Sequence, residues 1–165
     1  MTAANNAAPR GRILARLFVV FLCSAAWSAS ASMSCAVIGV TDGDTITALC
    51  AGNEQVKVRL AEIDAPEKKQ PFGTRSKQAL SDLCFGKQAE VVSQTKDRYG
   101  RTVARVRCDG QDASEQLVRS GMAWVFDRYV TDRSLYPLQD EARAARRGLW
   151  VDVEPIPPWQ WRKTK

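Results

Sequence analysis

The stretch VRLAEIDAPE, residues 58–67, decides how we expect the chain to fold. Its first apolar residues alternate as in a strand, at Val56, Val58 and Leu60. The apolar phase then moves to an odd position at Ile63, and a one-residue slip of this kind predicts a β-bulge near Ala61-Glu62. With the bulge, Arg59 and Asp64 share a face; without it they point to opposite faces. A polar face in water is the simpler explanation of these charges.

A hairpin precedes this strand. Residues 37–49 have the pattern of two short strands around Asp42-Gly43, a favoured two-residue turn. If Thr41 faces Asp44, the same register places Cys35 opposite Cys50, and the remaining pair is Cys84 with Cys108. We therefore predict two disulfides, Cys35–Cys50 and Cys84–Cys108. Four buried free thiols are the alternative.

The remaining elements follow from periodicity and from helix start and stop signals. We predict a third strand at 55–63, a helix at 72–84, strands at 89–94 and 102–108, a helix from Asp112 to near Gly121, an extended segment at 124–129, and a helix from 134 or 136 to 147. Five short strands with three helices make an α+β domain, and a small closed five-stranded barrel is the natural architecture. Trp150 and Trp159 should pack back on the domain, with base stacking as the less favoured alternative. The arginines of the last helix, Arg143, Arg146 and Arg147, indicate a solvated face rather than a nucleic-acid patch.

The first 31 residues have the layout of a secretory signal peptide. Three arginines precede a short apolar run at 17–27, and Ala29-Ser30-Ala31 fits a cleavage site after Ala31. The run is short for a membrane span of ~20 residues, although an uncleaved anchor is the alternative. We therefore predict an exported protein, periplasmic or extracellular. Its folded domain would be 32–165, with a core at about 36–150 and a Trp/Pro-rich tail at 151–165.

Composition limits the chemistry that the chain can perform. The 165 residues contain no histidine, which removes the commonest general base and metal ligand. Catalysis must therefore use carboxylates, arginine, lysine, tyrosine or a metal held by oxygen. Beyond residue 31 the chain carries 21 basic and 18 acidic side chains, a net charge of +3. This balance permits nucleic-acid binding but does not demand it.

Two acidic positions suggest a cation site. A DG turn explains Asp42 and Gly43, but it leaves Asp44 unexplained. Asp44 and Asp64, with the backbone carbonyl of Ala65, offer the oxygen ligands that hard divalent cations take. Asp-rich turns are common, so this signal is weak on its own. The loop DRYGR, residues 97–101, is unremarkable as a turn, yet it places a second arginine just before a strand.

Together, TDGDTI, VRLAEIDAPE and DRYGR, in this order, resemble the staphylococcal nuclease (thermonuclease) family, and so does the later EQLVRSGMAWV. The likeness spans roughly residues 36–150. It implies an OB-fold barrel of five strands with three helices. It also implies a calcium-dependent phosphodiesterase that cuts DNA and RNA at the 5′ P–O bond and leaves 3′-phosphate ends.

The resemblance also implies roles for single residues. The calcium ligands would be Asp44, Asp64 and the carbonyl of Ala65, the catalytic residues Arg59, Glu67 and Arg101, and the substrate contacts Arg98, Tyr99 and Tyr129. The chain departs from the family in three places: Ala65 stands where threonine is frequent, Asp127 lies near the position of a tyrosine, and the basic loop before DRYGR is shorter.

We expect a monomer that acts on DNA and RNA and has no stable membrane association once the signal is cleaved. The alternative is a non-catalytic OB-type module that binds nucleic acid or protein. A disulfide-stabilised structural protein would leave Arg59, Glu67 and Arg101 unexplained.

Overall fold

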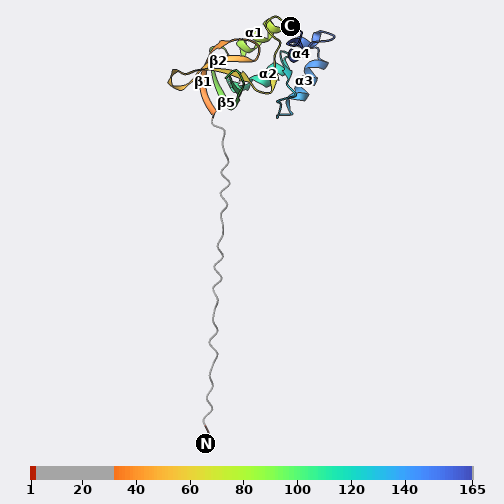
Figure 1. The fold of residues 1–165 in the computed structure, drawn as a ribbon. Helices are drawn as coiled ribbons and strands as arrows, with labels where there is room; N and C mark the ends of the chain where they lie inside the picture. Colours follow the sequence, from red (N-terminus) through yellow and green to blue (C-terminus); the bar gives the residue numbers. More distant parts are fainter. Residues whose placement is uncertain (3–31, 165) are drawn as a thin grey trace.

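A closed barrel of five strands forms the body of the protein (Figure 1). The structure is a computed structural model that describes residues 1–2 and 32–164, so residues 3–31 of the predicted signal peptide lie outside the described residues. The barrel strands are β1 (Ser32–Val40), β2 (Thr45–Leu49), β3 (Gln55–Leu60), β5 (Gln88–Lys96) and β6 (Thr102–Cys108). They run in the order β3-β2-β1-β5-β6, and parallel pairing of β3 with β6 closes the barrel. The predicted α+β barrel is therefore confirmed.

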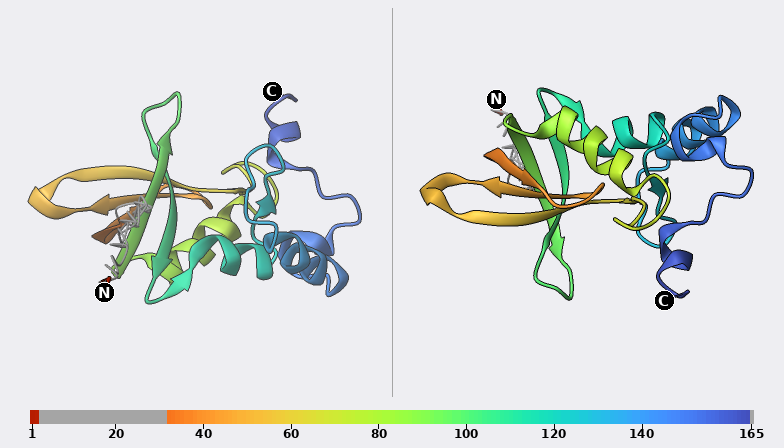
Figure 2. Two further views of the ribbon diagram at one scale, coloured as in Figure 1. Left: turned by 90° about the horizontal axis from the view of Figure 1, so that it is seen from below. Right: turned by 90° about the horizontal axis from the view of Figure 1, so that it is seen from above.

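The three predicted helices are α1 (Gly73–Cys84), α2 (Ala113–Arg119) and α3 (Leu135–Ala144). Figure 2 shows them following one another along one side of the strands, while the C-terminal segment runs back across the end of the molecule. Helix α3 ends three residues before the predicted Arg147, because Arg146 and Gly148 take left-handed backbone conformations. A fourth helix, α4 (Pro158–Trp161), was not predicted. In the part of the chain that the structure describes, no helix is long and apolar enough to cross a bilayer.

Short elements connect these parts. They are β4 (Ile63–Asp64), β7 (Gln111–Asp112), β8 (Trp124–Val125) and two 3-10 turns, η1 (Ala51–Asn53) and η2 (Gly148–Val151). Strand β4 pairs with β8 and not with the barrel, so the predicted strand at 55–63 is divided after Leu60. This division takes the chain out of the barrel at the point where the site lies.

The hydrophobic core fills the barrel and the space between the barrel and the helices. Its largest fully buried side chains are Ile46, Leu60, Ile63, Leu80, Leu117 and Leu135. Both predicted disulfides are present: Cys35–Cys50 joins β1 to the end of β2, and Cys84–Cys108 joins α1 to β6. A disulfide of this kind typically stabilises a domain by ~2–4 kcal/mol. Trp150 is buried and Trp159 packs against Trp124, as predicted for the tail.

The β1–β2 turn differs from the prediction. The amide of Thr41 donates to the carbonyl of Thr45 at 2.8 Å, so three residues, and not two, form the loop. Gly43 also lies outside the left-handed region that a favoured two-residue hairpin turn requires. An irregularity between Val37 and Gly39 shifts the register back by one residue. Cys35 therefore still meets Cys50, although the turn that predicted this pairing is wrong.

Candidate active site

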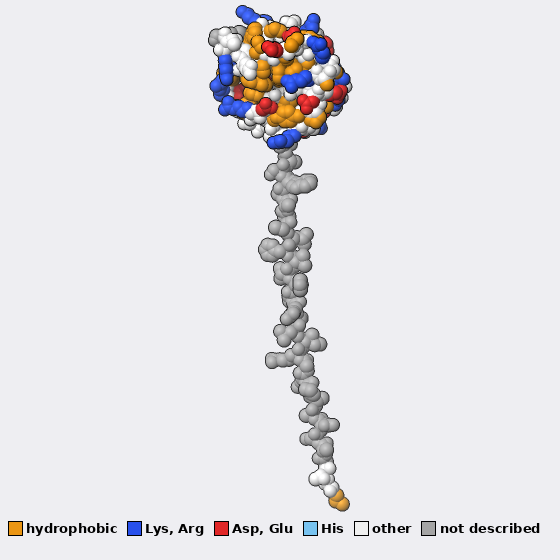
Figure 3. All heavy atoms as spheres, turned by 90° about the vertical axis from the view of Figure 1, so that its right-hand side faces the viewer, with side chains coloured by type: hydrophobic (Ala, Val, Ile, Leu, Met, Phe, Trp, Pro, Cys, Tyr) orange, Lys and Arg blue, Asp and Glu red, His pale blue; other side chains and the backbone are white. Residues whose placement is uncertain are grey.

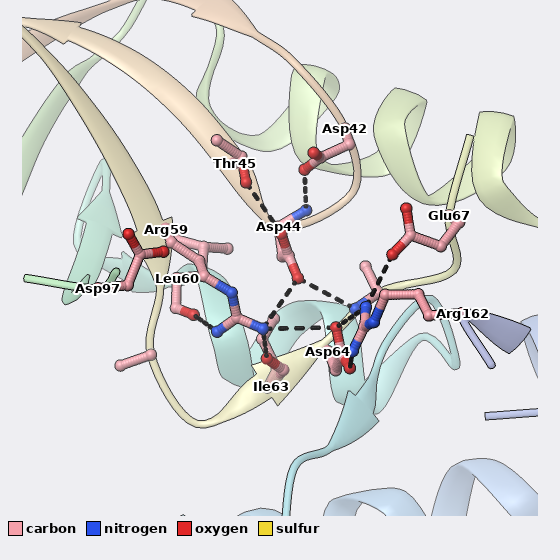
Figure 4. Close-up of polar contacts among 12 residues, drawn as sticks. Asp42, Asp44, Thr45, Arg59, Leu60, Ile63, Asp64, Glu67, Asp97 and Arg162 are labelled. Atoms are coloured by element: carbon pink, nitrogen blue, oxygen red, sulfur yellow. Dashed lines mark hydrogen bonds and ion pairs between the residues drawn. The ribbon is translucent and has the colours of Figure 1, made fainter. Parts of the chain in front are cut away.

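A buried pair of carboxylates shares one guanidinium group (Figure 4). Asp44 lies just before β2 and Asp64 ends β4, and they are 7% and 1% exposed. Arg59 Nη2 lies 3.5 Å from Asp44 Oδ2 and 3.4 Å from Asp64 Oδ1. The structure thus brings together three of the predicted site residues from the β1–β2 loop, β3 and β4.

The β1–β2 loop holds the Asp44 side chain in place. Its Oδ2 accepts a hydrogen bond from the amide of Ala65 at 3.2 Å, and its Oδ1 accepts one from the Thr45 hydroxyl at 3.0 Å. The Asp42 side chain accepts from the amide of Asp44 at 3.1 Å. Burial, followed by repulsion from Asp44, raises the pKa of Asp42 to about 6. Through its hydrogen bond with the Asp44 amide, the Asp42 side chain stabilises the loop that carries Asp44.

Close packing explains the glycine in this loop. A Cβ atom at Gly43 would lie 2.6 Å from Cβ of Ser76 on α1 and 2.7 Å from Cβ of Ala65. Real Cβ atoms essentially never approach so closely, so only glycine fits without a shift of the backbone. The loop can therefore lie against both α1 and the segment that carries Asp64.

A left-handed residue turns Arg59 and Asp64 to one side. Glu62 has φ 70° and is 3% exposed, and its carbonyl accepts from the amide of Phe126 at 2.8 Å. The predicted β-bulge near Ala61-Glu62 is wrong, because β3 ends at Leu60 and β4 pairs with β8, but the predicted placement of Arg59 and Asp64 on one side is confirmed. Within this turn Arg59 also donates to two backbone carbonyls, those of Leu60 at 3.2 Å and Ile63 at 3.1 Å.

The Glu62 carboxylate clamps this turn to a distant loop. Its Oε1 accepts from the amide and the hydroxyl of Thr131 and from the amide of Asp132, with amide distances of 2.8 and 2.9 Å. Burial alone would raise the pKa of Glu62, but these hydrogen bonds outweigh burial and lower it. Arg105 lies beneath and pairs with four acids, Glu62, Asp112, Glu115 and Asp132. The hydrogen bonds of Glu62 and the ion pairs of Arg105 thus hold the backbone turn between Arg59 and Asp64.

Glu67 begins the next segment and faces Asp64 across a second arginine. Its amide donates to the Gln70 side chain at 3.0 Å, which orders the turn before α1. Its Oε1 accepts from Arg162 Nη1 at 2.7 Å. The same Arg162 donates to both oxygens of Asp64, at 3.2 and 2.6 Å (Figure 4). These hydrogen bonds oppose the effect of burial, which raises the pKa of Asp64.

Sequence reasoning missed Arg162. It follows α4, is 44% exposed and lies 98 residues after Asp64 in the chain. In the sequence it belongs to a polar ending, WRKTK, that carries no motif. One local signal could have predicted α4: Pro158 suits the first position of a helix. Arg162 directly follows this helix, so α4 sets the direction of the chain at Arg162.

Arg101 approaches the site through a threonine. It donates to Asp97 at 2.8 Å and to the Thr45 hydroxyl at 3.2 Å, and Thr45 in turn donates to Asp44. Arg98 and Tyr99 occupy the exposed tip of the same loop, where the Arg98 guanidinium lies 4.8 Å from the Tyr99 ring centre. The Arg101 guanidinium lies 5.7 Å from the same ring centre, and the loop is linked to Asp44 through Arg101 and Thr45.

Aromatic side chains, Phe126, Tyr129 and Trp159, form a cluster next to Arg59. Tyr129 is exposed and packs edge-on against Phe126 at 5.1 Å. Phe126, which was not predicted, has its ring centre 5.9 Å from the Arg59 guanidinium. Trp159 stacks on Phe126 at 5.4 Å. Phe126 thus connects the site to the C-terminal segment.

The arginines in and just after α3 take part in structural contacts. Arg143 lies over the Trp150 ring at 4.5 Å, and Arg147 pairs with Glu141 at 2.9 Å. Figure 3 looks at this end of the molecule and shows hydrophobic, basic and acidic side chains interspersed. These contacts favour the predicted solvated face over a basic patch.

The donor atoms fit a hard divalent cation. Asp44 and Asp64 offer buried carboxylate oxygens, and a cationic group, the Arg162 guanidinium, already binds Asp64. Among residues 1–2 and 32–164, no three acidic, cysteine or histidine side chains converge on one point. Such a cation would therefore take two side-chain ligands and complete its shell with backbone oxygen, water or substrate.

The fold is an OB-type barrel, and arginine is a residue type that suits recognition of phosphate groups. The family described as "Staphylococcal nuclease homologue" matches residues 57–152, and the chain belongs to this family. A Haemophilus influenzae protein named "Uncharacterized endonuclease" is 44% identical over 151 residues, which cover 92% of this chain and 84% of that protein. A Shigella flexneri protein named "Micrococcal nuclease" is 38% identical over 163 residues, with 92% and 91% covered. The family and these relatives support an endonuclease activity that hydrolyses nucleic acid.

Proposed function

We propose that this chain is a calcium-dependent endonuclease that hydrolyses DNA and RNA at the 5′ P–O bond and leaves 3′-phosphate ends. The observation that carries the proposal is the convergence of Asp44, Asp64 and Arg59, with Glu67 joined to Asp64 through Arg162. The cation would be held by the two aspartates and the carbonyl of Ala65. Calcium is proposed because every donor is a hard oxygen and because the motifs resemble those of the thermonucleases.

Each residue has a distinct task in this proposal. When bound, the cation would offset the negative charge of the phosphodiester. The planar fork of Arg59 suits two oxygens of the phosphate, whose charge grows as a fifth bond forms at phosphorus. Glu67 is partly exposed and would orient a water molecule and accept its proton. Arg101 would reach the phosphate from the loop beside Thr45.

Three substitutions test these roles. Arg59→Ala, Glu67→Ala and Arg101→Ala should each lower kcat at least ~10²-fold, the scale of losing one charge-stabilising or proton-transfer group. Lys57→Ala is the matched control for Arg59→Ala, because Lys57 lies two residues away on β3 and is exposed. A variant that keeps kcat within a few-fold of the unmodified protein removes its residue from the proposed mechanism.

The assay should also identify the cation, the substrate and the product ends. End-labelled single-stranded DNA, duplex DNA and RNA would be incubated with calcium, magnesium or manganese, and in parallel with chelator. Phosphatase treatment of the fragments slows their migration only when the ends carry phosphate, and labelling of the 5′ ends shows which side of the bond breaks. Cleavage that persists in chelator would contradict the cation requirement.

A binding module is the second candidate, because Arg162 covers Asp64 and Glu67 in the structure. Binding of oligonucleotide without any product, in every cation tested, would establish it.

Export, with the protein acting as a monomer in the periplasm or outside the cell, is proposed from the signal-like segment at 1–31 and the two disulfides. No stable membrane association should remain after cleavage of the signal. Cell fractionation, with size-exclusion chromatography of the recovered protein, tests both points.

A further inference from the structure

The C-terminal segment places an internal cation on the carboxylates of the site. Arg162 donates from Nη2 to Asp64 Oδ2 at 2.6 Å and from Nη1 to Asp64 Oδ1 at 3.2 Å, so its fork uses both oxygens of that carboxylate. The same Nη1 donates to Glu67 at 2.7 Å. Charge-assisted, two-pronged contacts of this kind are the strong ones among hydrogen bonds. Any other cation that binds Asp64 must compete with them.

The chain that carries Arg162 is attached at several points apart from this contact. The Gln70 side chain donates to the carbonyl of Ile156 at 2.6 Å, and Pro158 is buried. Trp159 stacks almost parallel on Phe126, with an interplanar angle of 10°. The guanidinium can therefore leave Asp64 by rotation of its own side chain while the segment stays docked.

The charges explain why a cationic group lies here. Asp64 and Glu67 both lie within hydrogen-bond distance of Arg162 Nη1. Among the described residues, Arg59 is in ion-pair contact with Asp44 and Asp64 but not with Glu67. Without a further positive charge Glu67 would face Asp64 unbalanced, and like charges held together are unfavourable. Arg162 supplies that charge. Arg162 also lies outside residues 57–152, the part of the chain that matches the family.

We propose that Arg162 is a displaceable counter-ion that competes with a divalent cation for Asp64 and thereby lowers the affinity of the site for that cation. The proposal rests on the proposed function in one respect, that Asp64 is a cation ligand. Because binding linkage is reciprocal, the factor by which the Arg162 contact weakens cation binding equals the factor by which a bound cation weakens that contact. Arg162 thus sets the cation concentration at which the site fills.

The test is cation affinity without nucleic acid. Chelator-treated full-length protein would be titrated with calcium and with manganese by isothermal titration calorimetry, for the unmodified chain and for Arg162→Gln, Arg162→Lys, Lys163→Gln and Asp64→Asn. Lys163→Gln is the matched control because it removes one positive charge from the neighbouring position. We expect Arg162→Gln to bind the cation about tenfold more tightly, and Arg162→Lys to lie between, because lysine keeps the charge and loses the fork. Lys163→Gln should stay within about twofold.

Thermal unfolding gives an independent readout and checks that the variants fold. In chelator, Arg162→Gln should unfold at a lower temperature than Lys163→Gln, because three charge-assisted hydrogen bonds are lost. With saturating cation this difference should shrink or reverse, because the cation then displaces Arg162 from Asp64 in Lys163→Gln, and Arg162→Gln lacks that contact from the start.

The outcomes separate the two proposals. Unchanged or weaker cation binding in Arg162→Gln, while the unmodified chain binds and Asp64→Asn does not, overturns the counter-ion role and leaves the proposed cation site intact. Binding that appears only in Arg162→Gln supports the counter-ion role. Failure of every variant to bind either cation overturns both proposals.

Discussion

Removal of the Glu62 carboxylate should destabilise the protein more than removal of any exposed acid. The carboxylate is buried, and its Oε1 alone accepts three hydrogen bonds from Thr131 and Asp132. The donors are less buried than the carboxylate, since Thr131 is exposed and Asp132 is half-buried, but loss of one partner from a buried ionic network typically costs ~3–5 kcal/mol in total. Glu62→Ala should therefore lower the free energy of unfolding by ~3–5 kcal/mol.

Two further variants divide this cost into backbone and side-chain parts. Glu62 has φ 70°, a conformation that costs a non-glycine residue ~1–2 kcal/mol, whereas glycine loses ~0.5–1 kcal/mol more than alanine in chain entropy on folding. Glu62→Gly should therefore be more stable than Glu62→Ala by up to ~1 kcal/mol. Glu62→Gln keeps one acceptor oxygen for the three donors and should lose less than either.

Equilibrium unfolding in urea, followed by tryptophan fluorescence with disulfides oxidised and chelator present, measures these differences. With an m-value of ~1–3 kcal/mol/M, the expected loss in Glu62→Ala lowers the midpoint by ~1–5 M. Glu115→Ala is the control, since Glu115 also contacts Arg105 but is more exposed, and it should lose less than ~1 kcal/mol. A midpoint shift in Glu62→Ala no larger than in this control would refute the clamp.

Three further outcomes are expected. Hydrogen bonds from Ser134, then from Arg105, lower the pKa of Asp132 to about 2, so its stabilising contribution is complete above its unfolded pKa of ~3.9 and is lost as pH falls toward 2. The difference in urea midpoint between the unmodified chain and Asp132→Asn should thus be constant at pH 5–7 and vanish near pH 2. Gly43→Ala should lose ~1–3 kcal/mol in the same urea assay, because its Cβ would overlap two neighbouring Cβ atoms. Saturating cation should raise the melting temperature of the unmodified chain but not of Asp44→Asn, as scanning calorimetry would show.

Local patterns were enough to predict the barrel and an irregularity beside the site. The change of apolar phase between Leu60 and Ile63 located this irregularity, because side-chain alternation in a strand has a fixed period, although the structure has a division between β3 and β4 there rather than a bulge. The capping pattern at Asp112 and Glu115 predicted the start of α2, where the Asp112 side chain accepts from the amide of Glu115 at 3.1 Å. Both signals lie within a few residues of the feature that they predict.

The features that sequence reasoning missed depend on contacts between distant segments. Asp42-Gly43 has the composition of a two-residue turn, but Gly43 is needed for its approach to α1 and Ala65, which local composition does not reveal. Arg162 reaches Asp64 from the other end of the chain, and α4, which directs it there, is a single turn held by aromatic packing. A helix so short is stabilised by its tertiary contacts rather than by propensity.

The site therefore has two halves that differ in how they are held. Arg59 and Asp64 flank a left-handed residue whose carboxylate is buried in a network of hydrogen bonds and ion pairs, so their relative position is fixed by the backbone. Arg162 is partly exposed and its guanidinium is held at the site by contacts with two carboxylates, so its position depends on what else binds them. A change in the first half should alter stability and geometry together. A change at Arg162 should alter cation affinity while the barrel stays intact. Measuring unfolding and cation binding on the same proteins therefore distinguishes the two kinds of variant.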